Sequence, residues 1–342
     1  MEPTITPTVL AFTSSASNQL AKVEQHYNAG VELFEQGRFK EAIAEFDEAI
    51  RLDPNYAQAF NNRGSAYFLL GQPEQAIQDY DEAIHLDPQE GGAYVGRGNA
   101  YSDLGQYHRG LPDYDEAIRL DSQNTDAYYN RGEAYRNLSQ YHRAIQDLDE
   151  AIRLDPKLAR AYYSRGNTYT DLGQPEQAIQ DYDEAIRLDL QFALIYNNRG
   201  VAYNELSGHE RAIQDLDEAI RLDPQFALAY NNRGFAYNEL GEHKRAIQDL
   251  DEAIRLDSQF VLAYNNRGFA YKELGEHERA IQDLDEAIRL GPQFAGAYVL
   301  RALTYTHLGL DEQAQQDITW AVNLGFNRAD LEAVIENAKR QR

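Results

Sequence analysis

The chain has 342 residues and a formal net charge of −24, because 56 acidic side chains outnumber 32 basic ones. This acidity argues against nucleic acid as a partner, since a protein that binds the phosphate backbone needs a basic face. The chain has no cysteine, which excludes disulfides and thiolate chemistry and fits the reducing cytoplasm better than a secreted or periplasmic location. No apolar run reaches the roughly 18 residues of a membrane helix, so no membrane partner is expected.

Residues 1–22 precede the regular part of the chain. They contain a short apolar patch, Val9 to Phe12, followed by small residues. Glu2, and the lack of any Lys or Arg before Lys22, argue against a secretion signal. We therefore expect a flexible N-terminal segment over 1–22.

From Val23 onward the sequence repeats itself every 34 residues. The recurring glycines are Gly30, Gly64, Gly98, Gly132, Gly166, Gly200, Gly234 and Gly268, with Ala302 in the ninth position. The recurring alanines are Ala49, Ala83, Ala117, Ala151, Ala185, Ala219, Ala253, Ala287 and Ala321. The sequence thus predicts nine repeats, over 23–56, 57–90, 91–124, 125–158, 159–192, 193–226, 227–260, 261–294 and 295–328. Such a period indicates a solenoid, in which each repeat buries its apolar face against its neighbours.

Each repeat reads as a helix, a tight turn and a second helix. In 227–260, apolar and small residues form two helical stripes, one of Tyr230, Gly234 and Tyr237 and the other of Ala246, Leu250 and Ala253. Gly241 interrupts the period between them and is the residue type that ends a helix. Short side chains at Gly234, Ala246 and Ala253 are predicted to let the two helices pack closely.

This pattern resembles the tetratricopeptide repeat: an aromatic residue at the fourth place, glycine at the eighth, tyrosine at the eleventh, alanines at the twentieth and twenty-seventh, and proline at the thirty-second. The resemblance covers 23–328. It implies an all-α, right-handed superhelical solenoid whose concave face is lined by the first helix of each repeat. After it, Asn327 and Asp330 have a capping-box spacing and Leu331, Val334 and Ile335 form an apolar stripe, so we predict a C-terminal capping helix over 329–342.

Three departures from the pattern are informative. Gly110 replaces the alanine at the twentieth place, and Pro112 falls inside the second helix of the third repeat. An interior proline costs a helix about 3 kcal/mol, so this repeat is the predicted weak point. Leu190 replaces the proline that separates the fifth repeat from the sixth.

Charged residues also recur. Along the second helices, Asp115, Asp149 and Asp251 each precede an arginine by four residues, which predicts exposed pairs with Arg119, Arg153 and Arg255. An arginine occupies the seventh place in eight repeats: Arg63, Arg97, Arg131, Arg165, Arg199, Arg233, Arg267 and Arg301. These arginines either grip an anionic ligand or pair with carboxylates of a neighbouring second helix, and abundant acid nearby favours the second interpretation.

The resemblance also implies which residues face the groove. Those we single out are Asn62, Asn130, Leu194, Asn197, Asn198, Leu228, Asn231, Asn232, Phe235, Asn238, Glu239, Leu262, Asn265, Asn266, Phe269 and Glu273. An asparagine amide offers donors and an acceptor that match an extended peptide backbone. Similar asparagine ladders hold an extended polypeptide in the tetratricopeptide arm of O-GlcNAc transferases. Acid at the thirteenth place favours a partner that is neutral or basic and partly apolar.

No catalytic motif, phosphate loop or zinc signature is present. The repeated His209, His243 and His277 are interpreted as turn residues, because equivalent positions of neighbouring repeats are too far apart to share a metal. The sequence predicts no cofactor, no metal and no enzymatic activity. It favours a scaffold or adaptor that binds an extended polypeptide segment in the groove. A self-assembling array, and a regulatory or targeting subunit of an enzyme complex, are the alternatives, and the oligomeric state stays open.

Overall fold

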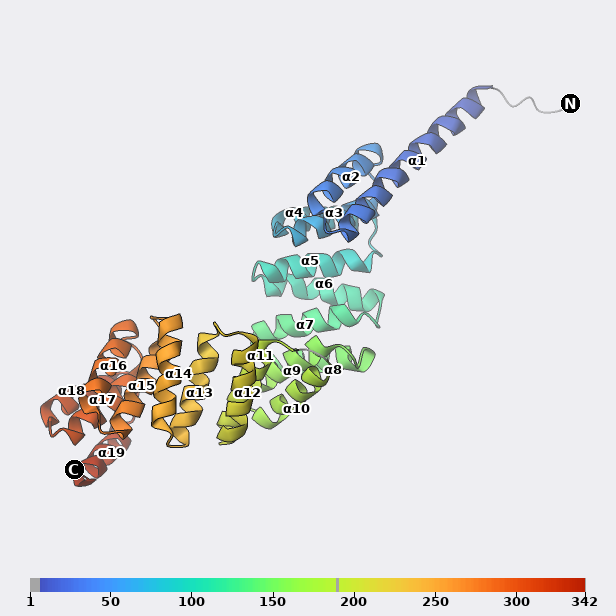
Figure 1. The fold of residues 1–342 in the computed structure, drawn as a ribbon. Helices are drawn as coiled ribbons and strands as arrows, with labels where there is room; N and C mark the ends of the chain where they lie inside the picture. Colours follow the sequence, from blue (N-terminus) through green and yellow to red (C-terminus); the bar gives the residue numbers. More distant parts are fainter. Residues whose placement is uncertain (1–6, 189–190, 342) are drawn as a thin grey trace. The chain divides into compact units, whose positions relative to one another are not determined.

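The computed structural model describes residues 7–188 and 191–341, and these residues form nineteen α-helices and no strand (Figure 1). In chain order the helices are α1 (Pro7–Glu35), α2 (Phe39–Leu52), α3 (Ala57–Leu69), α4 (Pro73–Leu86), α5 (Gly91–Asp103), α6 (Tyr107–Leu120), α7 (Thr125–Asn137), α8 (Tyr141–Leu154), α9 (Ala159–Asp171), α10 (Pro175–Arg187), α11 (Ala193–Glu205), α12 (His209–Leu222), α13 (Ala227–Glu239), α14 (His243–Leu256), α15 (Val261–Glu273), α16 (His277–Leu290), α17 (Ala295–His307), α18 (Asp311–Asn323) and α19 (Arg328–Gln341). The predicted all-α solenoid of helix-turn-helix repeats is confirmed.

The chain forms two compact units, which we call the N-terminal half (1–168) and the C-terminal half (169–342). Within each half, neighbouring helices pack in chain order, so a second helix such as α14 lies between its own first helix, α13, and the next one, α15. In repeats two to nine the first helix begins on the first residue of the 34-residue period, as α13 does at Ala227. The structural and sequence periods therefore share one register.

The turn inside each repeat depends on a left-handed residue. Gly241, between α13 and α14, has φ of 74°. Ser207 occupies the same place one repeat earlier and has φ of 56°, although only glycine adopts this region without a steric cost. The turn geometry is thus imposed by the packing of the helix pair and is kept even where the favoured residue is missing.

Small residues permit the close approach of the two helices. Ala246 and Ala253 on α14 are completely buried. A Cβ atom added at Gly234 on α13 would lie 2.8 Å from Cγ of Leu250, which is closer than side-chain atoms approach. The predicted contact between Gly234 and the alanine face of α14 is therefore present, and it leaves no room for a larger residue.

The first helix starts earlier than the sequence indicated. We expected a flexible segment over 1–22, whereas α1 begins at Pro7 and runs without interruption into the first repeat. Proline is well suited to the first turn of a helix, because its missing N–H would have no partner there. Gln19 donates from Nε2 to the backbone oxygen of Leu52 at 3.0 Å, and Val23 is buried. Alanine and glutamine in this stretch are good helix formers, and this local preference does not depend on the 34-residue period.

The C-terminal helix α19 covers the last repeat. Oδ1 of Asn327 accepts hydrogen bonds from the backbone nitrogens of Ala329 and Asp330, at 2.8 and 3.2 Å, and so caps the helix as predicted. Leu331 and Ile335 are buried in a cluster with residues of α17 and α18. This helix therefore shields apolar surface that a further repeat would otherwise cover.

One residue assigned to the α19 stripe lies outside it. Val334 is 49% exposed, while Leu331, Ile335 and Ala338 are buried. Positions 331, 335 and 338 follow the i, i+4, i+7 spacing of one narrow face, and residue 334 falls beside that face. The predicted stripe was therefore right in two of its three members.

The third repeat keeps its second helix intact. Helix α6 continues through Pro112, which is exposed and is the sixth residue of the helix. The helix therefore loses a single backbone bond, to His108, instead of ending. At Gly110 an added Cβ would lie 2.8 Å from the backbone oxygen of Gly98, so α5 and α6 come closer here than alanine would allow. Leu190, the other departure, lies outside the described residues.

Candidate functional site

The first helices of consecutive repeats contact each other directly. In the C-terminal half, α13 contacts α11 and α15, and α15 contacts α17; in the N-terminal half, α3 contacts α1 and α5. Among the described residues of each half, no second helix contacts the second helix of the next repeat. Each stack is therefore narrower along its first helices, so these helices line the concave side of the array. This is the surface that the resemblance implied for the groove.

Asparagine amides on these helices bond to one another across repeats. Nδ2 of Asn232 donates to Oδ1 of Asn197 at 2.9 Å, and Nδ2 of Asn266 donates to Oδ1 of Asn231 at 3.0 Å. Within a repeat, Nδ2 of Asn231 donates to Oδ1 of Asn232 at 3.2 Å. We call this chain of amides, made of Asn197, Asn198, Asn231, Asn232, Asn265 and Asn266, the asparagine ladder.

The ladder lies partly beneath the surface. Asn197 and Asn231 are only 2% and 3% exposed. Asn238 is also buried, donates from Nδ2 to the backbone oxygen of Asn266 at 3.0 Å, and shares a hydrogen bond of 3.1 Å with Nδ1 of His243. These three predicted groove residues thus bind other residues of the array. Because identical amides recur at the repeat period, each finds its partner in the adjacent repeat.

A similar bond occurs outside the ladder, between the sixth place of the second repeat and the fifth place of the first. Nδ2 of Asn62 donates to the hydroxyl of Tyr27 at 3.0 Å. Asn130, another predicted groove residue, lines a polar pocket of about 360 Å³ together with Asp103, Tyr107 and Glu133. The sequence pattern did not indicate Tyr107 or Glu133, because the residue type at these two positions of the repeat varies among the repeats.

Apolar side chains remain open to solvent on the first helices. Leu194, Leu228 and Leu262, at the second place of three successive repeats, are 40%, 37% and 42% exposed. Phe235 is 37% exposed and Phe269 is half-buried. Leu194 also lines a pocket of about 520 Å³ at the start of α11. Exposed large apolar residues in register are typical of a surface that meets another molecule.

A pocket of about 210 Å³ lies between α13, α15 and α17. It is lined by Phe235, Asn238, Glu239, Asn265, Asn266, Phe269 and Leu300. The structure thus brings together six of the predicted groove residues at one place and adds Leu300, which is not among the predicted groove residues. We call it the α13–α17 pocket. Glu273, a further predicted residue, is exposed and forms an ion pair with Lys272.

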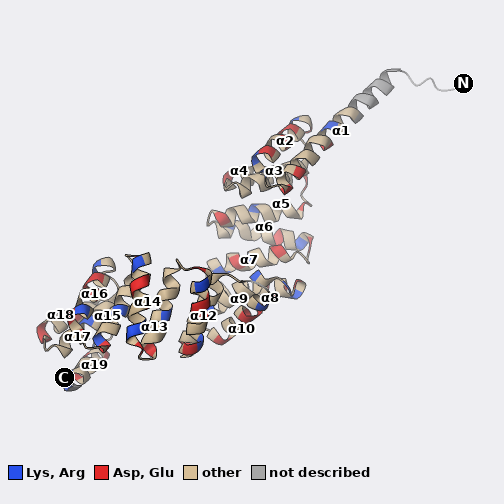
Figure 2. Cartoon of the chain, in the orientation of Figure 1, with Lys and Arg blue, Asp and Glu red and all other residues tan. Residues whose placement is uncertain are grey.

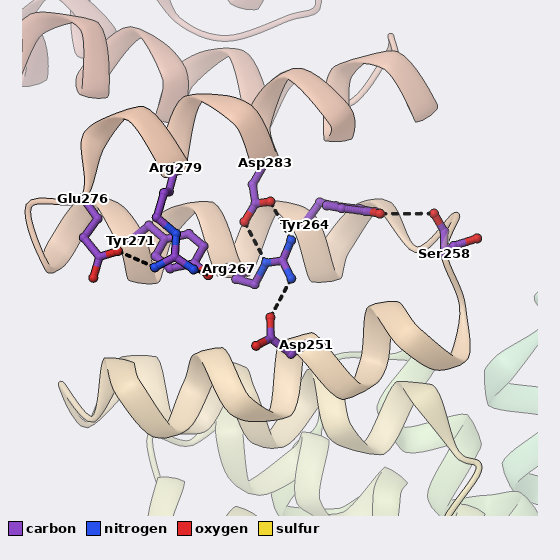
Figure 3. Close-up of polar contacts among 8 residues, drawn as sticks. All are labelled: Asp251, Ser258, Tyr264, Arg267, Tyr271, Glu276, Arg279 and Asp283. Carbon is purple, nitrogen blue, oxygen red and sulfur yellow. Dashed lines mark hydrogen bonds and ion pairs between the residues drawn. The ribbon is translucent and has the colours of Figure 1, made fainter.

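The seventh-place arginines have a structural role. Figure 3 shows Arg267 on α15 between Asp283 on α16 and Asp251 on α14. Nε and Nη2 of Arg267 donate to both carboxylate oxygens of Asp283, at 2.8 and 2.7 Å, and Nη1 donates to Asp251 at 2.6 Å. Seven of the eight arginines join the second helix of their own repeat to that of the preceding one in this way, which is the second of the two interpretations that the sequence left open.

Burial and charge act together on these pairs. Burial alone lowers the pKa of Arg233, but its hydrogen bonds and attraction to Asp249 and Asp217 outweigh this and raise its pKa above the ordinary value. Asp249 is 7% exposed, and burial raises its pKa although Arg233 opposes the shift. The guanidinium therefore stays charged, and the carboxylate depends on it.

The exposed pairs differ from those predicted. Arg255 donates to Glu252, three residues earlier, and not to Asp251. Arg119 and Arg153 likewise bond to Glu116 and Glu150. Asp115, Asp149 and Asp251 accept from seventh-place arginines of the next repeat instead. The prediction was wrong because it considered one helix at a time, whereas a multidentate arginine on the adjacent helix competes for the same carboxylate. Figure 2 shows basic residues interleaved with acidic ones on the helices of both halves.

Sequence comparison identifies the repeat. The family model of the TPR repeat matches residues 30–71, 98–139, 132–173, 166–207, 205–241 and 236–275, and that of the tetratricopeptide repeat matches 57–90 and 261–294. The chain belongs to the tetratricopeptide repeat (TPR) family. TPR proteins are generally non-enzymatic scaffolds for protein–protein interaction. A search of curated protein sequences found no match.

Solved TPR structures resemble this chain in fold. The Cut9–Hcn1 hetero-tetramer of the APC/C is 15% identical, with a TM-score of 0.59 over 92% of this chain and 76% of that chain. The type IV pilus biogenesis factor PilW is 17% identical and has a TM-score of 0.56. The match covers 59% of this chain and 94% of the PilW chain. A TPR protein from Parabacteroides merdae is 20% identical and has a TM-score of 0.54. The match covers 72% of this chain and 98% of the Parabacteroides merdae chain. At these identities the likeness shows the TPR fold alone.

The histidines and carboxylates of the TPR array do not converge on a metal-binding geometry in the part of the chain that the structure describes. Across residues 7–188 and 191–341, no group of three or more His, Cys, Asp or Glu side chains is arranged to hold a metal ion. His209 and His243 instead share hydrogen bonds of 3.1 Å with Asn204 and Asn238 at the turns. None of the described helices combines the length and apolar character needed to cross a lipid bilayer.

Proposed function

We propose that this chain is a non-enzymatic adaptor that binds an extended polypeptide segment along its first helices. The observation that carries the proposal is the α13–α17 pocket, in which Phe235, Phe269 and Leu300 supply apolar walls and asparagine amides supply polar groups. A groove with apolar pockets beside amide donors and acceptors suits a peptide in an extended conformation, since side chains fill the pockets and the backbone bonds to the amides.

Charge indicates the kind of segment. Glu205 and Glu239 are exposed at the thirteenth place of the sixth and seventh repeats. The chain as a whole carries a formal charge of −24. Carboxylates beside apolar pockets favour a partner that is partly apolar and neutral or basic, because like charges across an interface are costly.

The exposed leucines provide the test. We would replace Leu194, Leu228 and Leu262 together by serine and compare captured proteins by mass spectrometry. The matched control replaces Glu210, Lys244 and Glu278 by serine, which are exposed on α12, α14 and α16. Partners that bind in the groove are lost from the leucine variant and retained by the control. An identical set of partners for the parent chain and the leucine variant would remove the groove from the proposal.

A further inference from the structure

The asparagine ladder ends at the α13–α17 pocket with an acceptor that has no donor. Oδ1 of Asn265 is buried and, within the described part of the chain, has no hydrogen-bond partner. Asn197 and Asn231 occupy the same place in the two preceding repeats, and their Oδ1 atoms accept from Asn232 and Asn266. The sixth place of the ninth repeat, where the donor for Asn265 is expected, is Leu300. A buried polar atom left without a partner is unfavourable, and a turn of the Asn265 side chain toward the pocket that it lines brings Oδ1 within reach of a bound donor at the loss of one bond of 3.5 Å to Asn266.

We propose that this pocket is a subsite for one apolar residue of an extended peptide, and that a backbone N–H of that peptide donates to Oδ1 of Asn265. The inference rests on the proposed function and specifies the chemistry at one point of the groove. The ligand replaces the asparagine that the ninth repeat lacks, and its side chain occupies the space beside Leu300.

The size and walls of the pocket fit such a residue. Its volume of about 210 Å³ exceeds the roughly 150 Å³ of an engineered cavity that takes up benzene. Phe235 and Phe269 come from α13 and α15, and Leu300 from α17. A branched aliphatic or aromatic side chain therefore fits among three apolar surfaces, and its burial removes exposed area of Phe235 from water.

One carboxylate at the pocket is free to pair with a ligand. Glu239 lines the pocket and is exposed, and it makes no ion pair with any residue that the structure describes. Glu273, one repeat later, is instead bonded to Lys272. A lysine or arginine adjacent to the apolar residue would meet Glu239, which selects a basic and apolar segment over an acidic one.

An unpartnered acceptor outside the ladder, at the same place of the second repeat, shows why the site is local. Oδ1 of Asn61 is also buried without a donor, because Gly96 holds the sixth place of the next repeat. There the space is filled: a Cβ atom on Gly96 would lie 2.4 Å from Cζ of Tyr80. At Asn265, by contrast, the residue with the unpartnered acceptor lines a pocket.

The test uses the full chain and a library of short peptides randomised at every position. Binding of selected peptides is then measured for the parent, for Leu300→Asn, which supplies the missing donor, and for Leu300→Met, which keeps the wall apolar. Each backbone nitrogen of one selected peptide is methylated in turn. We expect an apolar residue beside Lys or Arg in the selected peptides, about tenfold weaker binding to Leu300→Asn, and unchanged binding to Leu300→Met.

N-methylation separates the hydrogen bond from the apolar contact. At one position it should weaken binding to the parent by about tenfold and have little effect on Leu300→Asn. Asn265→Leu serves as the second variant, because it removes the acceptor while retaining an apolar residue, and it should abolish the effect of methylation.

The outcomes distinguish the two proposals. Selected peptides that bind the parent and Leu300→Asn equally, or that tolerate methylation at every position, would overturn the subsite and leave peptide binding by the groove intact. A library that yields no peptide bound to the parent chain would overturn the subsite and the proposed function together.

Discussion

Nδ2 of Asn266 on α15 donates to Oδ1 of Asn231 on α13, 3.0 Å away and 35 positions back along the chain. The bond joins two consecutive repeats. Its donor, the side-chain amide of Asn266, lies at a position that the sequence predicts to face a ligand. An amide nitrogen carries two N–H groups, so the ladder uses one donor of Asn266 and leaves the second for a ligand. The asparagines therefore stabilise the array first, and under the proposed function a partner bonds to the donors that remain.

This relationship predicts unequal costs for two equivalent substitutions. Asn231→Ala removes the acceptor of Asn266 and the donor to Asn232, so we expect the free energy of unfolding to fall by about 1–3 kcal/mol. Asn265→Ala, one repeat later, removes only a bond of 3.5 Å and an acceptor without a donor, and should cost less. Urea denaturation of both variants is the measurement, and equal costs would show that the ladder does not stabilise the array.

Arg233→Met should cost about 3–5 kcal/mol, because it leaves Asp249 buried without its bidentate partner. The matched control is Arg255→Met, since the Arg255–Glu252 pair is exposed and such pairs contribute little. Thermal unfolding of the two variants at neutral pH measures the difference. A similar melting temperature for both would contradict the structural role of the seventh-place arginines.

The loss of stability in Arg233→Met is expected to depend on pH. In the parent, burial raises the pKa of Asp249 and Arg233 opposes the rise, so removal of Arg233 raises this pKa further. A carboxyl whose folded pKa exceeds its unfolded value contributes stability that is fully present below the unfolded pKa and is lost as pH rises through the folded pKa. The deficit of Arg233→Met relative to the parent should therefore be largest at neutral pH and narrow as the pH falls toward the ordinary Asp value of 3.8. A deficit that does not change with pH would mean that Asp249 stays charged in the variant.

Ala253→Leu should destabilise the array by about 1–3 kcal/mol, because Ala253 is completely buried between helices that have no space for a larger side chain. Glu252→Leu, at the adjacent residue, should have a much smaller effect, since its side chain pairs only with Arg255 at the surface. Melting temperatures of the two variants compare them directly, and equal shifts would mean that α14 presents a different face to its neighbours.

Pro112→Gln should stabilise the third repeat by up to about 3 kcal/mol, because it restores the backbone donor to His108 inside α6. Glutamine is the residue at the same place in the next repeat, Gln146, so the variant adds no unfamiliar side chain. Hydrogen exchange of the α6 amides should slow in the variant. Unchanged exchange would show that the proline is accommodated without cost.

Most of the fold could be predicted from the sequence, because the repeats share residue types at the same positions of the 34-residue period. Gly234, Ala246 and Ala253 have the packing that their periodic spacing predicted. The errors concern interactions between helices of different repeats. The assignment of Asp251 to Arg255 considered a single helix, whereas the deciding competitor, Arg267, lies on another. Spacing along a helix carries no information about such a competitor.

At the candidate site, too, the sequence predicted features of single helices but not contacts between repeats. Leu228, Phe235 and Glu239 were expected at the surface of the first helices and are exposed there. The burial of Asn231 was not foreseeable, because it depends on the donor supplied by Asn266 in the following repeat. Leu300 was overlooked because it departs from the asparagine pattern, and it forms one wall of the α13–α17 pocket.

The seventh-place arginines bear on how such a chain changes its length. Arg233 bonds 16 residues forward to Asp249 and 16 residues backward to Asp217, and Arg199 and Arg267 do the same in the flanking repeats. A duplicated 34-residue segment therefore brings one carboxylate for its own arginine and another for the arginine that follows. Insertion or deletion of a whole segment leaves no guanidinium stranded, whereas a cut within a segment does. Arrays of this kind can thus grow or shrink in whole repeats without compensating substitutions.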